Sequence, residues 1–351
     1  MKNKVKSLIF AVITLSVLIG AAIFNPGNHN LLSITTMANR NSGRITLSPG
    51  GEAFGVKYFT KGVLVVGLTD VETAEGLRAP ARDSGLQVKD IITTVGGKDI
   101  KSAEDFQKTV AGSGGSGIEL KFLRDGAENS LTISPVVDKG DNTYKLGIWV
   151  RDSTAGIGTI TFIDPSTGEF GALGHGISDS DTGVLMPLDK GIIVDVVING
   201  IVAGKKNSPG ELKGKFANYR KGELSINSEV GIFGKFDKIP ENMAKSIPIG
   251  YRDELKIGKA YILTTLDTGK PGRYEIEIEK IFSDSGSIKN FLIKVTDSNL
   301  LTKTGGIIQG MSGSPIIQNG RLIGAVTHVL VDDSTRGYGI CIENMIEGLR
   351  G

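Results

Sequence analysis

The six residues Gly310-Met311-Ser312-Gly313-Ser314-Pro315 lie between two apolar runs, 306–309 and 315–317, that are typical of strands. Glycine on either side of a serine lets the backbone approach a substrate closely, because glycine has no Cβ. Backbone N–H groups in such a turn can stabilise the oxyanion that forms when a hydroxyl attacks a carbonyl. The turn therefore predicts Ser312 as a nucleophile and the N–H groups of Gly310 and Ser312 as oxyanion donors. An ordinary Gly/Ser turn between two strands also fits the pattern.

A nucleophilic serine needs a base, and the chain contains only three histidines. His29 lies in a polar stretch typical of a linker, and His328 follows the serine turn closely in sequence. His175 is flanked by Gly174 and Gly176 and is therefore the predicted general base. The third member of such a site is a carboxylate that holds the imidazole tautomer, and spacing leaves five candidates open. These are Asp164, Asp179, Asp181, Asp195 and Asp297.

Composition favours strands and turns over long helices. The chain has 351 residues, 39% hydrophobic residues, 49 glycines and only 6% aromatic residues, with many short β-branched runs. Its net charge of +2 and the lack of a basic block with interleaved aromatics argue against a nucleic-acid partner. The single cysteine, Cys341, excludes an internal disulfide, and we expect no metal site and no cofactor.

The amino terminus predicts the compartment. Lys2, Lys4 and Lys6 precede an uncharged run over 7–24, an order that directs the following chain across a membrane. Residues 1–24 are therefore a predicted signal or anchor transmembrane segment, and the rest is expected to be extracytoplasmic. No clean small-x-small cleavage site follows the run, which favours an uncleaved anchor. Residues 25–43 are rich in Asn, Ser and Gly and are predicted to be a linker.

A separate pattern occupies 44–137. A strand at 62–67, a short helix over 79–86, a strand with a two-glycine turn over 90–98 and a helix capped by Ser102 precede two further strands. This order resembles a PDZ domain, in which an extended peptide adds as a strand beside a helix. The Gly-rich loop that matches the family's peptide-binding loop contains Glu52, an unfavourable neighbour for a peptide carboxylate. The peptide-binding residues that the resemblance implies are Gly51, Ala53, Phe54, Gly55 and Val56.

Residues 138–351 read as strand after strand. The stretch 274–279 alternates apolar and charged residues almost ideally, and 191–198 is a buried run. About 200 residues of this pattern, with no strong helix before 343–349, suit a pair of six-stranded β-barrels. The fold class is therefore mainly β, and the predicted base and nucleophile come from opposite halves of this region.

The run 305–329, together with Gly-His-Gly at 174–176 and the preceding PDZ pattern, resembles the stage IV sporulation protein B peptidases of endospore-forming bacteria. The resemblance implies a PDZ domain followed by a trypsin-like serine endopeptidase, secreted from the forespore into the space between its two membranes. The resemblance implies that the enzyme cleaves the exposed part of a membrane partner, which relieves the inhibition of an intramembrane metalloprotease and so activates a late mother-cell sigma factor. It also implies that the enzyme cleaves itself near the amino terminus. By position, the base is His175, the nucleophile is Ser312 and the orienting carboxylate is Asp297.

Other interpretations stay open at this point. His328 follows the nucleophile turn on the strand that forms the wall of the primary specificity pocket in the trypsin-like fold, although a plain strand histidine fits equally well. The whole chain could instead be a membrane-tethered PDZ scaffold with a silent protease-like half. A housekeeping quality-control protease is a third interpretation, but there the PDZ domain normally follows the protease.

Overall fold

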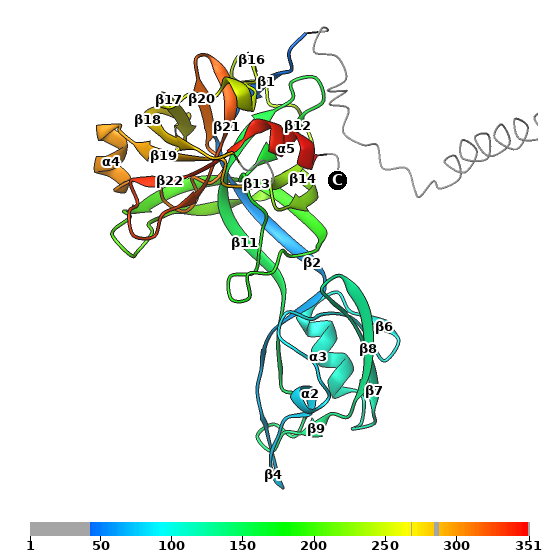
Figure 1. The fold of residues 1–351 in the computed structure, drawn as a ribbon. Coiled ribbons are helices and arrows are strands. Elements are labelled where there is room, and N and C mark those ends of the chain that lie inside the picture. Colours follow the sequence, from blue (N-terminus) through cyan, green and yellow to red (C-terminus); the bar gives the residue numbers. More distant parts are fainter. Residues whose placement is uncertain (1–42, 268, 284–287, 350–351) are drawn as a thin grey trace, which may run out of the picture. The chain divides into compact units, whose positions relative to one another are not determined.

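The computed structural model describes residues 43–267, 269–283 and 288–349. The predicted anchor (1–24) and all but the last residue of the predicted linker (25–43) lie outside them. Within the described residues, no helix has both the length and the apolar character needed to cross a membrane. Strands dominate, as composition predicts (Figure 1).

Six strands of the first half pair in a ring. The order around this ring is β2, β11, β12, β15, β14 and β13, with β13 returning to β2. A short edge is added by β1 (Thr46–Pro49), which pairs with β11 and with β16 (Ile247–Pro248). The strands of this first barrel are β2 (Ala53–Leu68), β11 (Ile148–Ile163), β12 (Glu169–Ala172), β13 (Leu188–Val202), β14 (Glu211–Ser228) and β15 (Gly231–Phe236).

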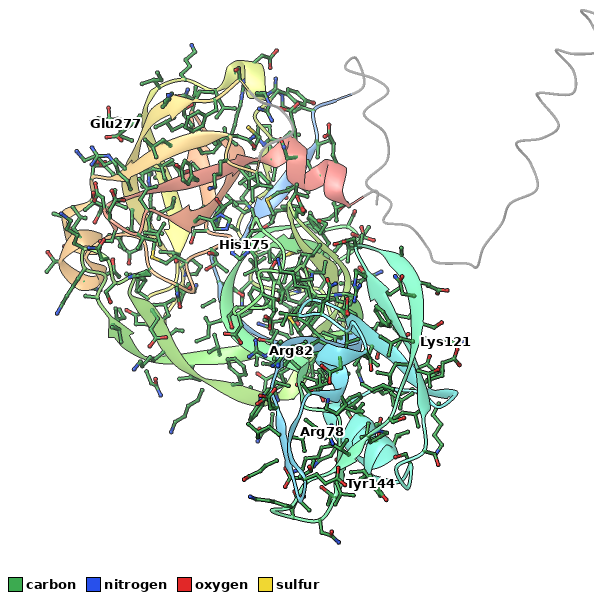
Figure 2. All side chains as sticks on the ribbon, turned by 60° about the horizontal axis from the view of Figure 1, so that its bottom comes forward. Arg78, Arg82, Lys121, Tyr144, His175 and Glu277 are labelled. Carbon is green, nitrogen blue, oxygen red and sulfur yellow. The ribbon has the colours of Figure 1, made fainter. Side chains whose placement is uncertain are left out.

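The second half forms a closed six-stranded barrel in the order β17-β18-β19-β22-β21-β20. The predicted alternation over 274–279 is confirmed in β18, where Ile276 and Ile278 are buried while Glu277 points outward (Figure 2). The strands are β17 (Gly258–Thr264), β18 (Gly272–Ile281), β19 (Phe291–Val295), β20 (Pro315–Gln318), β21 (Arg321–Val329) and β22 (Arg336–Cys341). Helix α4 (Ser298–Thr304) precedes the serine turn, η1 (Arg252–Glu254) precedes the barrel and α5 (Ile342–Gly348) follows it.

A third core lies within the region expected to be a PDZ domain. Ser102 caps α3 (Ala103–Ala111) by accepting a 3.0 Å hydrogen bond from the Asp105 N–H, and Phe106 and Val110 are buried, as the sequence predicts. The remaining elements are β3 (Val71–Thr73), β4 (Gly76–Arg78), α2 (Pro80–Asp83), β5 (Ile91–Val95), β6 (Lys98–Asp99), β7 (Ile118–Arg124), β8 (Ala127–Ile133), β9 (Val136–Val137) and β10 (Tyr144–Lys145).

This region is inserted into the first barrel, whereas the sequence pattern predicts that it precedes the barrels as residues 44–137. β2 pairs with β11 from one end of β2 to the other, from Ala53–Thr159 to Leu68–Ile148 (Figure 1). Over residues 54–60 β2 also pairs with β13 of the barrel. At Val63 and Leu64 it pairs instead with β5 of the inserted region. The chain therefore leaves the barrel along β2 and returns along β11. The physical reason for the difference is that a buried, β-branched strand has the same local pattern in either domain.

Candidate active site

The serine turn lies between α4 and β20, at the start of the second barrel's hairpin. Gly310 and Gly313 have φ values of +97° and +93°, a region that residues with a Cβ rarely adopt. A Cβ on Gly313 would also collide with the carbonyl oxygen of Thr159. The glycines therefore serve the conformation that the sequence predicts. The Ser312 hydroxyl donates a 2.8 Å hydrogen bond to the carbonyl oxygen of Thr327.

The two predicted oxyanion donors have no acceptor among the described residues. The neighbouring N–H groups of Met311, Gly313 and Ser314 all donate to backbone carbonyls, whereas those of Gly310 and Ser312 donate to none in the described chain. Both residues line a cavity of about 480 Å³. Two unbonded N–H groups at the edge of a cavity are what the stabilisation of an oxyanion requires.

His175 follows β12 of the first barrel and lines the same cavity. Leu173 and Gly174, which lead into it, have φ values of +67° and +69°, so the chain turns sharply here. The His175 Nδ1 lies 2.9 Å from the Gly176 carbonyl oxygen, an arrangement that places the proton on Nδ1 and leaves Nε2 as an acceptor. Burial lowers the pKa of His175 below its usual range, against the opposing effect of the Gly176 carbonyl. The imidazole is therefore neutral at pH 7, as a general base must be.

The second histidine of the site is His328 on β21. Its ring centroid lies 4.9 Å from that of His175, with the planes tilted by 38°. The pKa of His328 is lowered to about 4. The largest cause is desolvation by the surrounding protein, and the nearby His175 and Lys289 contribute smaller effects. Figure 2 shows His175 where the ribbons of the two barrels meet. His175 and Gly176 from the first barrel, and Gly310, Ser312, Thr327 and His328 from the second, all line the cavity.

Comparison with known families gives this geometry a context. The model of the family described as SpoIVB peptidase S55 matches residues 142–346, which is more than half of the chain. This chain belongs to the SpoIVB peptidase S55 family. It is therefore a serine peptidase. A second family model, that of the PDZ domain, matches residues 62–134. A search of curated proteins found no match.

Solved structures give more distant similarities. The PDZ domain of the SdrC-like protein from Listeria monocytogenes is 24% identical over 26% of this chain and 87% of its own, with a TM-score of 0.21. The active form of the Rv3671c protease from M. tuberculosis is 15% identical over 56% of this chain and 74% of its own, with a TM-score of 0.34. The HtrA-type protease AlgW with a decapeptide is 12% identical over 57% of this chain and 53% of its own, with a TM-score of 0.33. The assignment to the S55 family rests on the family model.

In this S55 peptidase the carboxylate predicted to orient the base, that of Asp297, makes no hydrogen bond to the His175 imidazole in the described chain. The Asp297 side chain caps α4, accepting hydrogen bonds of 2.9 and 3.0 Å from the N–H groups of Asn299 and Leu300. An N-cap carboxylate is held there by orphan N–H groups and by the helix dipole. Instead of a carboxylate, the partner of the His175 Nδ1 is the Gly176 carbonyl. The other sequence candidates, Asp164, Asp179, Asp181 and Asp195, are bonded to groups other than His175.

The five predicted peptide-binding residues also lie elsewhere than expected. The Gly51 N–H donates a 2.8 Å hydrogen bond to the carbonyl of Ile160 in the first barrel. Ala53, Phe54, Gly55 and Val56 lie in β2, which pairs with β11 on one edge and, from Phe54 onward, with β13 on the other. This backbone is occupied, so it cannot take up a peptide strand. These residues lie elsewhere than expected because they belong to the first barrel, into which the PDZ region is inserted.

A different groove lies in the PDZ region of this S55 peptidase. A cavity of about 530 Å³ is lined by α3 and by the segment that follows β10. The N–H groups of Leu146 and Gly147 donate to no acceptor in the described chain, and Gly147 has a φ of +70°. Successive free N–H groups around such a residue form an anion-binding concavity. Sequence reasoning missed this site, although the apolar-Gly-apolar run Leu146-Gly147-Ile148 directly after the domain was the available signal.

A further residue that the sequence analysis did not identify, Asn227, supports the loop that carries the base. Asn227 on β14 accepts a 2.8 Å hydrogen bond from the Ile177 N–H and donates bonds of 2.9 and 2.8 Å to the carbonyls of Ile177 and Met186. The Asn227 side-chain amide thus binds the backbone at both ends of the loop between Ile177 and Met186, where a neighbouring strand would otherwise supply the hydrogen bonds. No sequence signal distinguishes this asparagine from a surface one.

Proposed function

We propose that this serine peptidase is an endopeptidase in which Ser312 is the nucleophile and His175 the general base. The observation that carries the proposal is that one cavity contains Ser312, His175 and the two N–H groups without acceptors. The Ser312 Oγ attacks the scissile carbonyl while His175 Nε2 takes its proton, and the N–H groups of Gly310 and Ser312 stabilise the oxyanion. His175 then returns the proton to the leaving amine, and water releases the acyl group from Ser312 by the same route.

The site must rearrange before this step. The Ser312 hydroxyl is hydrogen-bonded to the Thr327 carbonyl, and the His175 ring lies against His328. Turning the Ser312 hydroxyl from the Thr327 carbonyl toward His175 Nε2 requires a side-chain rotation, and the Gly176 carbonyl can hold the imidazole tautomer throughout. The described arrangement is therefore that of a resting site.

We also propose two sites at which the enzyme contacts its substrate. His328 lines the cavity beside the nucleophile, which supports a role in the primary specificity pocket. The groove along α3 receives an extended peptide, whose terminal carboxylate binds the free N–H groups of Leu146 and Gly147. If His328→Ala leaves the preference for the residue before the cut unchanged, His328 has no pocket role.

The biological role follows from the family. We propose that the enzyme acts in sporulation signalling, in the space between the membranes of the forespore, where it cleaves the exposed part of a membrane partner and its own amino-terminal segment. The support is the S55 family model and the order of Lys2, Lys4 and Lys6 before the apolar run 7–24. Sequencing the amino terminus of shed protein tests self-cleavage, since a new terminus that is absent in Ser312→Ala is the expected result.

Labelling with a fluorophosphonate probe tests the proposal, because the probe reacts with an activated serine. We expect labelling of the wild type and none of Ser312→Ala. Ser166→Ala is the matched control, because it removes an exposed serine on the loop between β11 and β12 and should label like the wild type. Folded wild type that resists the probe would instead favour a tethered peptide-binding scaffold.

A further inference from the structure

We infer that Thr159 on β11 is a positioning residue that fixes both the serine turn and the base loop to a single strand. The inference rests on the proposed roles of Ser312 and His175 and adds a residue that touches neither substrate nor the reacting atoms. Thr159 is fully buried, with no exposed surface. It belongs to the first barrel, whereas the serine turn belongs to the second.

Two groups of Thr159 hold the serine turn. Its N–H donates a 2.9 Å hydrogen bond to the Ser312 carbonyl, and its hydroxyl donates a 2.8 Å bond to the Gly310 carbonyl. These carbonyls belong to the two peptide units on either side of the Met311–Ser312 peptide. That central peptide carries the Ser312 N–H, one of the two proposed oxyanion donors. Fixing both neighbours therefore fixes the direction of this N–H.

The third polar group of Thr159 holds the base loop. Its carbonyl accepts a 3.3 Å hydrogen bond from the N–H of Leu173, which lies two residues before His175. Gly313 also passes so close to this carbonyl that a Cβ there would collide with it. The N–H, the carbonyl and the hydroxyl of one residue thus contact the two loops that carry the proposed catalytic groups.

Thr161, two residues along the strand, makes a similar side-chain contact with the serine turn. It is also fully buried, and its hydroxyl donates a 2.8 Å hydrogen bond to the Gly313 carbonyl. A valine would satisfy the packing and the strand propensity at both positions. The hydroxyls are therefore the part of these side chains that the serine turn needs.

Replacing Thr159 by valine keeps the shape of the side chain but leaves the Gly310 carbonyl without its donor. An unpaired buried carbonyl is unfavourable, so the turn is expected to move toward another donor. Misplacement of a catalytic group by about 1 Å costs roughly 100-fold in rate. We expect Thr159→Val to lower the rate constant of fluorophosphonate labelling by roughly 10- to 100-fold.

The experiment compares Thr159→Val with Thr159→Ser in the full chain. Serine keeps the hydroxyl and should label at close to the wild-type rate, although it loses the methyl group. The matched control is Thr264→Val on β17, because Thr264 is fully buried and its hydroxyl has no hydrogen-bond partner in the described chain. This control should label like the wild type. Thermal unfolding is measured for each variant, and labelling is carried out well below the transition.

Wild-type labelling of folded Thr159→Val would overturn the inference. The same conclusion follows if Thr159→Ser is as slow as Thr159→Val, or if Thr264→Val is equally slow, since the loss then reflects general damage to the core. Should Thr159→Val not fold, Thr161→Val against Thr161→Ser decides, and a wild-type rate in the valine variant counts against the proposal. Failure of the proposed function looks different, because the wild type itself then does not label.

Discussion

The imidazoles of His175 and His328 lie against each other, with their centroids 4.9 Å apart, beside a serine whose hydroxyl is bonded to the Thr327 carbonyl. The base therefore lies against His328, while the nucleophile is hydrogen-bonded to the Thr327 carbonyl. Together these contacts define a resting site in which all the proposed catalytic groups are present but the proton path from Ser312 to His175 is not yet made.

The acid limb of the pH profile is the first prediction. Burial lowers the pKa of His175 from its usual value near 6.5, so the base remains neutral to a lower pH than a solvated histidine. Activity should therefore persist as the pH falls through 6.5 and should decline only below it. The pH dependence of kcat/KM reports the pKa of the base in the free enzyme. A midpoint at or above pH 6.5 would argue against a buried, neutral His175.

Asp297 provides a second prediction, because the structure gives it a structural role. Asp297→Ser keeps an N-cap for α4 and should label with the probe at close to the wild-type rate. Asp297→Ala removes the cap and should lower the free energy of unfolding by about 1 kcal/mol. Removing an orienting carboxylate from a catalytic triad costs roughly 10⁴-fold in kcat. A loss of that size in Asp297→Ser would restore the triad role to Asp297.

Gly313, one of the two glycines of the serine turn, gives a third prediction. Gly313→Ala places a Cβ against the Thr159 carbonyl at a φ of +93°, so both labelling and stability should fall. Gly320→Ala is the matched control, since Gly320 has a φ of +74° but nothing within 4 Å of its added Cβ. It should cost only the backbone strain of about 1 to 2 kcal/mol and should keep the labelling rate. Equal labelling by the two variants would show that the close approach is unimportant.

Trp149 allows a direct test of the groove in the PDZ region. It is the only tryptophan of the chain, it lines the groove, and 66% of its surface is exposed. A peptide with a free carboxyl terminus should change its fluorescence on binding, while the same peptide with an amidated terminus should bind more weakly. Trp149→Phe controls for signals that come from the peptide. Equal binding of the two peptides would contradict carboxylate capture by the N–H groups of Leu146 and Gly147.

Local physical chemistry accounts for what the sequence could predict. The alternation in β18, the Ser102 cap of α3 and the glycines around Ser312 depend only on neighbouring residues, and the structure confirms them. The meeting of Ser312 with His175 depends on two barrels, which the strand pattern over 138–351 predicts, and the family resemblance adds the role of each residue.

Other features depend on long-range contacts that local patterns do not contain. Ala53–Val56 reads as a buried strand whether it belongs to a PDZ domain or to a barrel, so the insertion could not be recognised. An aspartate before Ser298-Asn299 is equally suited to cap a helix or to orient an imidazole. In the sequence, Thr159 looks like any β-branched residue of a strand. Its partners Gly310 and Ser312 lie far away along the chain, and Leu173 has no feature that marks it as a partner.

The central claim is that Ser312 is a nucleophile activated by His175, and mass-spectrometric mapping of the fluorophosphonate adduct tests it most directly. The account predicts an adduct on Ser312 in the wild type and a strongly reduced yield in folded His175→Ala. An adduct on another residue, or one on Ser312 that forms equally fast without His175, would contradict it.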